Sequence, residues 1–257
     1  MSDPNPEGAM RAAFAPHPQV TGLVLRWCVQ EAQLLREALQ LNTALEALVL
    51  DGCELVLEHV AALGEALRTN KKLDFLSLKD NLLGEAGVAA LCEGLCANST
   101  LSELWLTSTG LSDVSAAVLG QALRTHTTLE TLRLDDNNIG DDGATALSQA
   151  LRANTFRLCT LDLESNLISD TGAASLGKAL QENTWLKVLQ LMDNHIGDAG
   201  AASLGAALRV NTTLKTLTID ENPIGNDGED ALARGVRRNI AIDPIELNGK
   251  VIEPGLG

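Results

Sequence analysis

The stretch "LETLRLDDNNIGDDGATALSQALRANT", Leu129 to Thr155, changes its pattern half-way along. Its first half alternates apolar and polar residues as a strand does, and its second half places leucines four residues apart, as one face of a helix does. Nearly the same sequence recurs from Leu158, from Leu186 and from Leu214. The chain is therefore an array of strand and helix repeats.

The leucine that opens each unit sets the register of the array. The opening leucines are Leu45, Leu73, Leu101, Leu129, Leu158, Leu186 and Leu214. Their period is 28 residues, with one interval of 29 near Arg157. We therefore predict a single repeat domain at 20–257, with nine strands and eight helices. It divides into a short repeat at 20–44, seven full repeats at 45–241 and a capping strand at 242–257, after a flexible leader at 1–19.

Positions within a unit, counted from the opening leucine, have distinct physical roles. A short strand buries positions 4 and 6, which are apolar, and leaves the alternating positions in solvent. Position 9 recurs as Asn, whose buried amide can bond the backbone of neighbouring turns. These residues are Asn81, Asn137, Asn166, Asn194 and Asn222. Cys28, Cys53 and Thr109 take this position in other units and can make weaker versions of the same bonds.

The helix of each unit has recognisable ends. The Asp of "GDDGA", "SDTGA" and "GDAGA" lies where a helix needs an N-cap, so we expect these carboxylates to cap the helices. Asn154, Asn183 and Asn211 end the helices. His126 replaces this Asn in its own unit, which indicates a capping role.

The motif Leu-x-x-Leu-x-Leu-x-x-Asn followed by a capped helix resembles the leucine-rich repeat. The 28-residue helical unit is similar to the ribonuclease-inhibitor-like subclass, most of all to the C-terminal repeats of NOD-like receptors and less closely to the Ran GTPase-activating protein. The resemblance covers about Val20 to Ile252 and implies an α/β horseshoe, or solenoid. Packed helices lie about 8 to 10 Å apart and paired strands about 4.8 Å apart. We therefore expect a parallel sheet of about nine strands on the concave side and the helices on the convex side.

Composition narrows the classes of partner and compartment. The 257 residues carry a net charge of −15, which argues against binding nucleic acid or an anionic membrane and favours a protein partner with a basic surface. No apolar run approaches the length of a membrane span. Five Cys without paired spacing suit a reducing, cytoplasmic compartment, with a nuclear or ciliary location left open. We expect a monomer or one part of a larger complex.

The few aromatic residues indicate a binding surface. The chain has three Trp, three Phe and no Tyr, and a core of Leu, Ala and Val needs none of them. Trp27, Phe75 and Trp105 fall on variable positions of the strand face, with Arg133 on the strand after Trp105. Exposed Trp and Arg are frequent binding hot spots, so we predict that they bind a partner. The alternative is that Trp105 lies flat over its neighbours and binds nothing.

Acidic residues line the rim where the strands leave the concave face. They are Asp51, Asp80, Asp135, Asp136, Glu164, Asp193, Asp220 and Glu221. A basic partner would neutralise their mutual repulsion, although a solvated face that keeps the array soluble explains them as well. The residues predicted to bind the partner are Trp27, Phe75, Lys79, Trp105, Arg133, Asp135, Asp136, Asp162, Glu164, Met192 and Asp193.

No catalytic residue, metal site or cofactor is predicted. The four His fall in the leader, a helix, a helix end and a turn, and none shares a face with a nucleophile and a carboxylate. Cys92 and Cys96 lie four residues apart on one helix, but the two further ligands of a metal site are not in view. Gly140 to Gly143 lies at a helix start and lacks the Lys of a phosphate-binding loop.

These patterns favour a non-catalytic protein-interaction scaffold over an enzyme. One alternative is a GTPase activator of the Ran-regulator type, although the acidic C-terminal tail of that family does not appear in the final "IEPGLG". Another alternative is an enzyme inhibitor or a sensor module, as the ribonuclease inhibitor and the NOD-like receptors suggest. The repeat scaffold alone does not choose among them.

Overall fold

Each of the seven full repeats forms a three-residue strand at positions 3 to 5 and then a helix. The computed structural model describes residues 21–24, 44–155 and 157–255. Its first eight strands are β1 (Gly22–Val24), β2 (Ala47–Val49), β3 (Phe75–Ser77), β4 (Glu103–Trp105), β5 (Thr131–Arg133), β6 (Thr160–Asp162), β7 (Val188–Gln190) and β8 (Thr216–Thr218). The helices are α3 (Leu57–Thr69), α4 (Gly84–Ala97), α5 (Asp113–Leu123), α6 (Asp141–Ala153), α7 (Asp170–Glu182), α8 (Asp198–Leu208) and α9 (Asn226–Val236).

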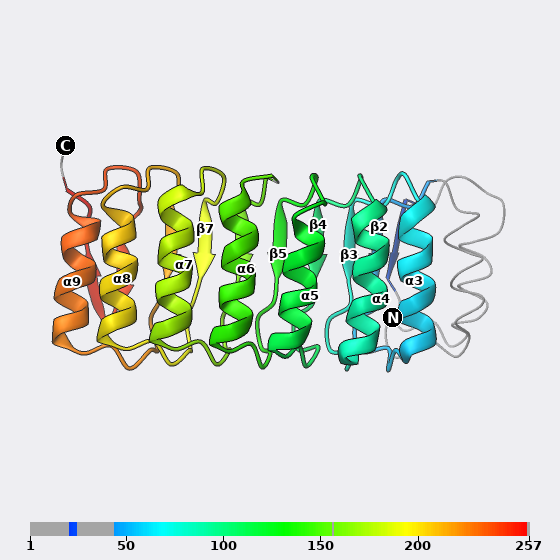
Figure 1. Cartoon of the computed structure of the whole chain (residues 1–257), viewed down its shortest axis with the longest axis horizontal. Helices are drawn as coiled ribbons and strands as arrows, with labels where there is room; N and C mark the ends of the chain where they lie inside the picture. Colours follow the sequence, from blue (N-terminus) through cyan, green and yellow to red (C-terminus); the bar gives the residue numbers. More distant parts are fainter. Residues whose placement is uncertain (1–20, 25–43, 156, 256–257) are drawn as a thin grey trace.

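The eight strands form one parallel sheet in chain order, covered on one face by the row of helices (Figure 1). Each strand residue pairs with the residue at the same position of the next repeat, as Leu104 does with Leu132. Position in the repeat therefore decides which side chains become neighbours across the sheet. The predicted α/β solenoid is confirmed. The helix predicted between the first two strands falls at 25–43, outside the described residues.

The ninth strand of the parallel sheet was predicted wrongly. Ile245–Leu247 (β9) pairs antiparallel with Lys250–Ile252 (β10) to form a separate hairpin. Asp243 still donates its N–H to the carbonyl of Lys215, 2.6 Å away, as the equivalent residue of each earlier repeat does. The next donor in the ladder would be residue 244, which is a proline without an N–H. The parallel ladder therefore stops at β8.

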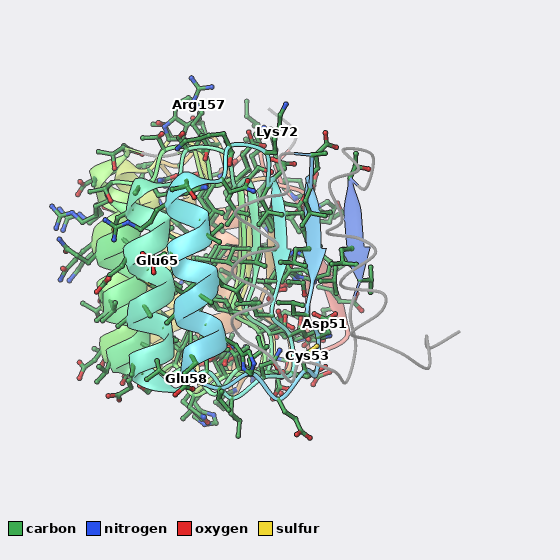
Figure 2. The ribbon with its side chains drawn as sticks, turned by 90° about the vertical axis from the view of Figure 1, so that its right-hand side faces the viewer. Asp51, Cys53, Glu58, Glu65, Lys72 and Arg157 are labelled. Carbon is green, nitrogen blue, oxygen red and sulfur yellow. The ribbon has the colours of Figure 1, made fainter. Side chains whose placement is uncertain are left out.

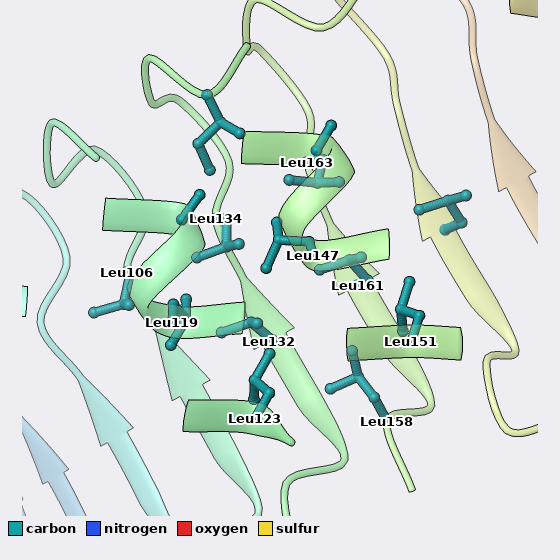
Figure 3. Close-up of a cluster of buried hydrophobic side chains, with 14 of the residues drawn as sticks. Leu106, Leu119, Leu123, Leu132, Leu134, Leu147, Leu151, Leu158, Leu161 and Leu163 are labelled. Atoms are coloured by element: carbon teal, nitrogen blue, oxygen red, sulfur yellow. The ribbon is translucent and has the colours of Figure 1, made fainter. Parts of the chain in front are cut away.

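The core lies between the sheet and the helices and consists mainly of leucine. In the middle of the array, Leu132 and Leu134 of the β5 repeat meet Leu147 and Leu151 of α6 (Figure 3). These four side chains are at most 2% exposed. Alternation along the strand and spacing of four along the helix direct them to the same layer, as predicted.

Asn at position 9 forms the predicted ladder. Asn166 donates its side-chain amide to the carbonyls of Leu134, Leu163 and Glu164, at 2.9, 3.2 and 3.0 Å. Its Oδ1 accepts the N–H of Ile139 at 3.0 Å. One buried side chain thus satisfies four backbone groups in two successive repeats. Asn81, Asn137, Asn194 and Asn222 make the same kinds of bond.

The helix-start Asp has a different role from the predicted one. The N-cap of α6 is Gly140, and Asp141 is the first residue inside the helix. The Asp141 carboxylate instead accepts the N–H groups of Ser169 and Gly172, both at 2.8 Å, at the start of the next helix. We call this contact the Asp clasp. Burial alone would raise the pKa of Asp141, but hydrogen bonds from Ser169 and Gly172 outweigh it and lower the pKa.

The clasp recurs from Asp113, Asp170 and Asp198 to the repeat that follows each of them. The clasp also explains why a Gly stands at the start of the helix that accepts it, as Gly172 does in α7. A Cβ on Gly172 would lie 2.7 Å from Oδ1 of Asp141, closer than atoms can approach. Each Asp therefore caps the helix of the next repeat and requires a glycine there.

A second Asn ladder joins the ends of the helices. Asn211 donates to the carbonyls of Leu180 and Asn183, at 2.7 and 3.2 Å, and Asn98 makes the equivalent bonds in its repeat. The capping role predicted for His126 is not supported. Its side chain is 1% exposed, and neither ring nitrogen has a hydrogen-bond partner within the described ranges. Burial lowers the pKa of His126 to about 4, so its ring is neutral.

Candidate protein-binding site

Three of the predicted binding residues form one cluster on the concave face, the face of the sheet opposite the helices. Phe75 lies on β3 at position 3 of its repeat. Trp105 on β4 and Arg133 on β5 lie at position 5 and are paired across the sheet. The Phe75 and Trp105 rings meet edge to face, with centroids 4.9 Å apart. The Arg133 guanidinium lies 5.0 Å from the Trp105 ring centroid on its other side. We call these three residues the aromatic cluster.

Trp105 both packs against its neighbours and reaches the surface. Its side chain is half-buried, as are those of Phe75 and Arg133. The indole Nε1 is enclosed and has no hydrogen-bond acceptor among the residues that the structure describes. An enclosed donor without a partner costs about 1 to 3 kcal/mol. Packing alone therefore does not account for a Trp at this position.

Two carboxylates hold Arg133 in place. Its Nε lies 3.3 Å from Oδ2 of Asp162 and 4.0 Å from Oδ1 of Asp135. Asp162 is 1% exposed, although position 5 was expected to face solvent. Burial raises the pKa of Asp162, and hydrogen bonding by the Glu164 N–H and the charge of Arg133 oppose this increase. Asp162 therefore acts as an anchor for Arg133 and is too buried to contact a partner directly.

Glu164 lies at the centre of the acidic rim and is half-buried. Burial raises its pKa, and the nearby charges of Asp162, Asp135, Asp193 and Glu221 raise it further. Each of these four carboxylates therefore repels the ionised form of Glu164. A positive charge placed here would relieve this repulsion.

Several rim carboxylates also have bonds within the protein. The hydroxyl of Thr107 donates to Asp135 at 2.8 Å, and that of Ser165 donates to Asp193 at 2.9 Å. Ser108 bonds Asp136 in the same way. Asp136 and Asp193, at position 8, have φ values of 56° and 52°, a left-handed conformation that Asp adopts more readily than most residues. The turn geometry thus explains part of the acidic rim.

The remaining predicted residues do not join the aromatic cluster as a single site. Lys79 and Met192 are half-buried at position 7 of their repeats, four repeats apart. Asp136 and Asp193 are exposed at the rim. Trp27 lies outside the described residues.

Charge is divided between the two edges of the solenoid. Asp51 and Glu58 lie at the edge where helices begin, and Lys72 and Arg157 lie at the opposite edge (Figure 2). Acidic residues at helix starts and basic residues at helix ends complement the helix dipoles. Helix stability therefore explains part of the division between edges.

Features of catalytic chemistry are few in the described ranges. No group of three His, Cys, Asp or Glu side chains there is arranged to hold a metal ion. Cys92 is buried, which raises the pKa of its thiol to about 12, and Cys96 is exposed. In the same ranges no helix is both long and apolar enough to cross a bilayer.

Comparison with known families matches the leucine-rich repeat model at residues 125–148, 158–177, 182–205 and 210–233. In these four segments the chain consists of leucine-rich repeats. The matched segments fall on four successive units of the solenoid.

Among solved structures, this leucine-rich repeat protein is similar to internalin C2 of Listeria monocytogenes. Their sequences are 19% identical, with a TM-score of 0.50 over 96% of this chain and 93% of that one. A chain in the crystal structure of the Rad7 and Elc1 complex in yeast gives 16% identity and a TM-score of 0.49, over 95% of this chain and 73% of that one. No match was found among curated protein sequences. The internalin likeness concerns the fold alone.

Sequence reasoning missed two features of this leucine-rich repeat protein. The Arg133 and Asp162 pair joins two position-5 residues of adjacent repeats, so their opposite charges were a usable signal. The second feature is a group of exposed apolar residues at the helix starts, including Leu82 and Val114. Its signal was a large apolar residue where most later repeats have a small or polar one.

Proposed function

We propose that this leucine-rich repeat protein is a non-catalytic scaffold that binds a partner protein on its concave face, with the aromatic cluster at the centre of the interface. The observation that carries the proposal is Trp105, half-buried between Phe75 and Arg133 with an unpaired indole N–H. Trp and Arg together are the residues most enriched in binding hot spots. Arg133 is already oriented by Asp162, which reduces the entropy lost on binding.

The partner contributes basic residues in this proposal. Asp135, Glu164, Asp193 and Glu221 provide negative charge beside the aromatic cluster. Burial raises the pKa of Glu164, and the charges of the other three raise it further. A Lys or Arg from the partner would be attracted to this region and would lower that pKa again. Electrostatic attraction of this kind acts mainly on the association rate and weakens with salt.

The subclass and compartment are part of the same proposal. The 28-residue helical repeat favours the ribonuclease-inhibitor-like subclass, and five Cys without paired spacing in the sequence favour a cytoplasmic protein. A GTPase activator of the Ran-regulator type is the enzymatic alternative. Stimulated GTP hydrolysis by added small GTPases would replace the scaffold proposal with that alternative.

Trp105→Ala tests the site directly. We expect the variant to keep the melting temperature of the wild type within a few degrees and to weaken partner capture by about 2 kcal/mol or more, as central Trp hot spots do. The measurement compares proteins recovered by immobilised wild type, Trp105→Ala and Gln149→Ala, a control on the exposed side of α6. Equal recovery by Trp105→Ala, with loss by Gln149→Ala, would move the binding surface to the helices.

A further inference from the structure

Exposed apolar side chains gather where the N-terminal strands lead into their helices. Leu82 is 83% exposed, Val114 54%, Val56 52% and Leu57 48%. We call these four residues the apolar ledge. The position of Leu82 is taken in later repeats by Gly110, Asn138, Leu167, His195 and Pro223, of which only Leu167 is a large apolar residue. The position of Val114 is taken by Asp142, Thr171, Ala199 and Asp227.

Contacts between repeats place Leu82 near the helix-start turns of the repeats on either side. The N–H of Leu55, just before Val56, donates to Asn81, just before Leu82, at 3.2 Å. A Cβ on Gly110 would lie 3.1 Å from Cδ2 of Leu82. The ledge therefore runs across the starts of α3, α4 and α5.

Helix stability does not explain these apolar residues. Val56 is the N-cap of α3 and accepts no hydrogen bond through its side chain. Val is among the poorest N-cap residues, and the helix dipole favours acidic residues in the first turn. Leu57 occupies the position where later repeats have the clasp Asp. The ledge thus replaces stabilising residues with exposed apolar surface, a pattern typical of interaction sites.

Charge around the ledge indicates what covers it. Glu54, Glu58, Asp80 and Glu85 are exposed beside it, and Asp113 is half-buried. We infer that the ledge docks a segment of a partner protein that presents apolar side chains next to Lys or Arg. The ledge belongs to the same repeats as Phe75 and Trp105, so one partner can extend from the concave face over this edge. The inference does not depend on the aromatic cluster, because the ledge residues lie on a separate surface.

A random-peptide phage library, selected on the immobilised full-length protein, tests the ledge. We expect recovered peptides to combine apolar residues with Lys or Arg. In fluorescence anisotropy, their affinity should fall about tenfold or more in Leu82→Ser with Val114→Ser and should weaken with added salt. Leu167→Ser is the matched control, since Leu167 has the position of Leu82 in a later repeat and is 48% exposed. It should retain full affinity.

Other outcomes overturn the inference. Failure to enrich peptides on the wild type over the ledge variant, or recovery of acidic peptides, would show that the ledge does not bind this chemistry. Equal loss in Leu167→Ser would remove its specificity. Self-association that depends on the ledge in sedimentation velocity would make a second copy the occupant. Trp105→Ala should keep peptide affinity, so failure of the concave site is recognised separately.

Discussion

The three N-terminal repeats, at 45–128, and the four C-terminal repeats, at 129–241, follow the same path but are joined differently. Position 9 is Asn in every C-terminal repeat, whereas Cys53 and Thr109 replace it in two N-terminal repeats. At the clasp position, Leu57 and Glu85 stand in the first two repeats. The aromatic cluster and the ledge are concentrated in the N-terminal repeats. Surface specialisation therefore coincides with fewer side-chain bonds between repeats.

We infer that the two parts of the solenoid have different roles, with stability concentrated in the C-terminal repeats and binding residues in the N-terminal repeats. The backbone ladder and the leucine core are the same throughout, so both parts fold alike. In a repeat protein, each repeat contacts mainly its neighbours, and stability is close to a sum over interfaces between repeats. The C-terminal interfaces can then support an N-terminal part whose residues are used for binding.

The largest contrast is between Asn166 and Thr109 at position 9. Asn166→Leu removes four bonds to backbone groups and should lower the free energy of unfolding by about 3 kcal/mol. Thr109→Val removes the hydroxyl bond to the Leu106 carbonyl at 2.7 Å and should cost about 1 kcal/mol. Urea unfolding of both variants measures the difference. Equal midpoints would show that the Asn ladder does not distinguish the two parts.

The Asp clasp gives the next contrast. Asp170→Ala removes the acceptor of the N–H groups of Gly197 and Gly200, at 2.7 and 2.8 Å, and should cost about 2 kcal/mol. Glu85→Ala changes the equivalent residue of an N-terminal repeat, where one 3.4 Å contact from the Ser112 hydroxyl is exposed, and should cost under about 0.5 kcal/mol. Thermal melting compares them. A loss at Glu85 as large as that at Asp170 would contradict this difference in roles.

His126→Asn should strengthen an N-terminal repeat by a smaller amount. The new amide can bond the carbonyls of the preceding repeat, as Asn98 and Asn211 do, and should add about 1 kcal/mol at pH 7. The ordinary His pKa of 6.5 falls to about 4 in the folded protein. Between these values the unfolded chain binds more protons, so the wild type loses stability as the pH falls from 6.5 towards 4. The difference between variant and wild type should widen over this window, and a constant difference would contradict the assignment.

Prediction from sequence succeeded for features that depend on the position of a residue within its repeat. Alternation and spacing placed the leucines of the core, and equal positions in consecutive repeats brought Trp105 and Arg133 together. It failed where a residue acts on the next repeat. An Asp at a helix start fits both a cap of its own helix and a clasp to a helix one repeat later, and the sequence pattern is the same for both. Pro244 was a readable signal, since it removes the next donor of the parallel ladder.

The sequence predicted which residues of the candidate site are neighbours, but not the ion pairs and hydrogen bonds that they form. Position numbers placed Arg133 beside Trp105, but they did not indicate that Asp162 would be buried beneath Arg133. The ledge was missed because binding residues were predicted only among strand-face positions, whereas Leu82 and Val114 are at positions 10 and 14 of their repeats. Exposure of a loop residue such as Leu82 depends on the packing of its neighbours, which spacing alone does not determine.

Hydrogen exchange of the protein with a partner recovered by the wild type tests whether the N-terminal repeats form the binding surface. We expect slower exchange in the partner complex at 75–86 and 103–114, which contain the strands and helix starts of the aromatic cluster and the ledge. Exchange at the outer turns of α7 and α8, and at β7 and β8, should be unchanged. Protection confined to the helices or to the C-terminal repeats would contradict the account.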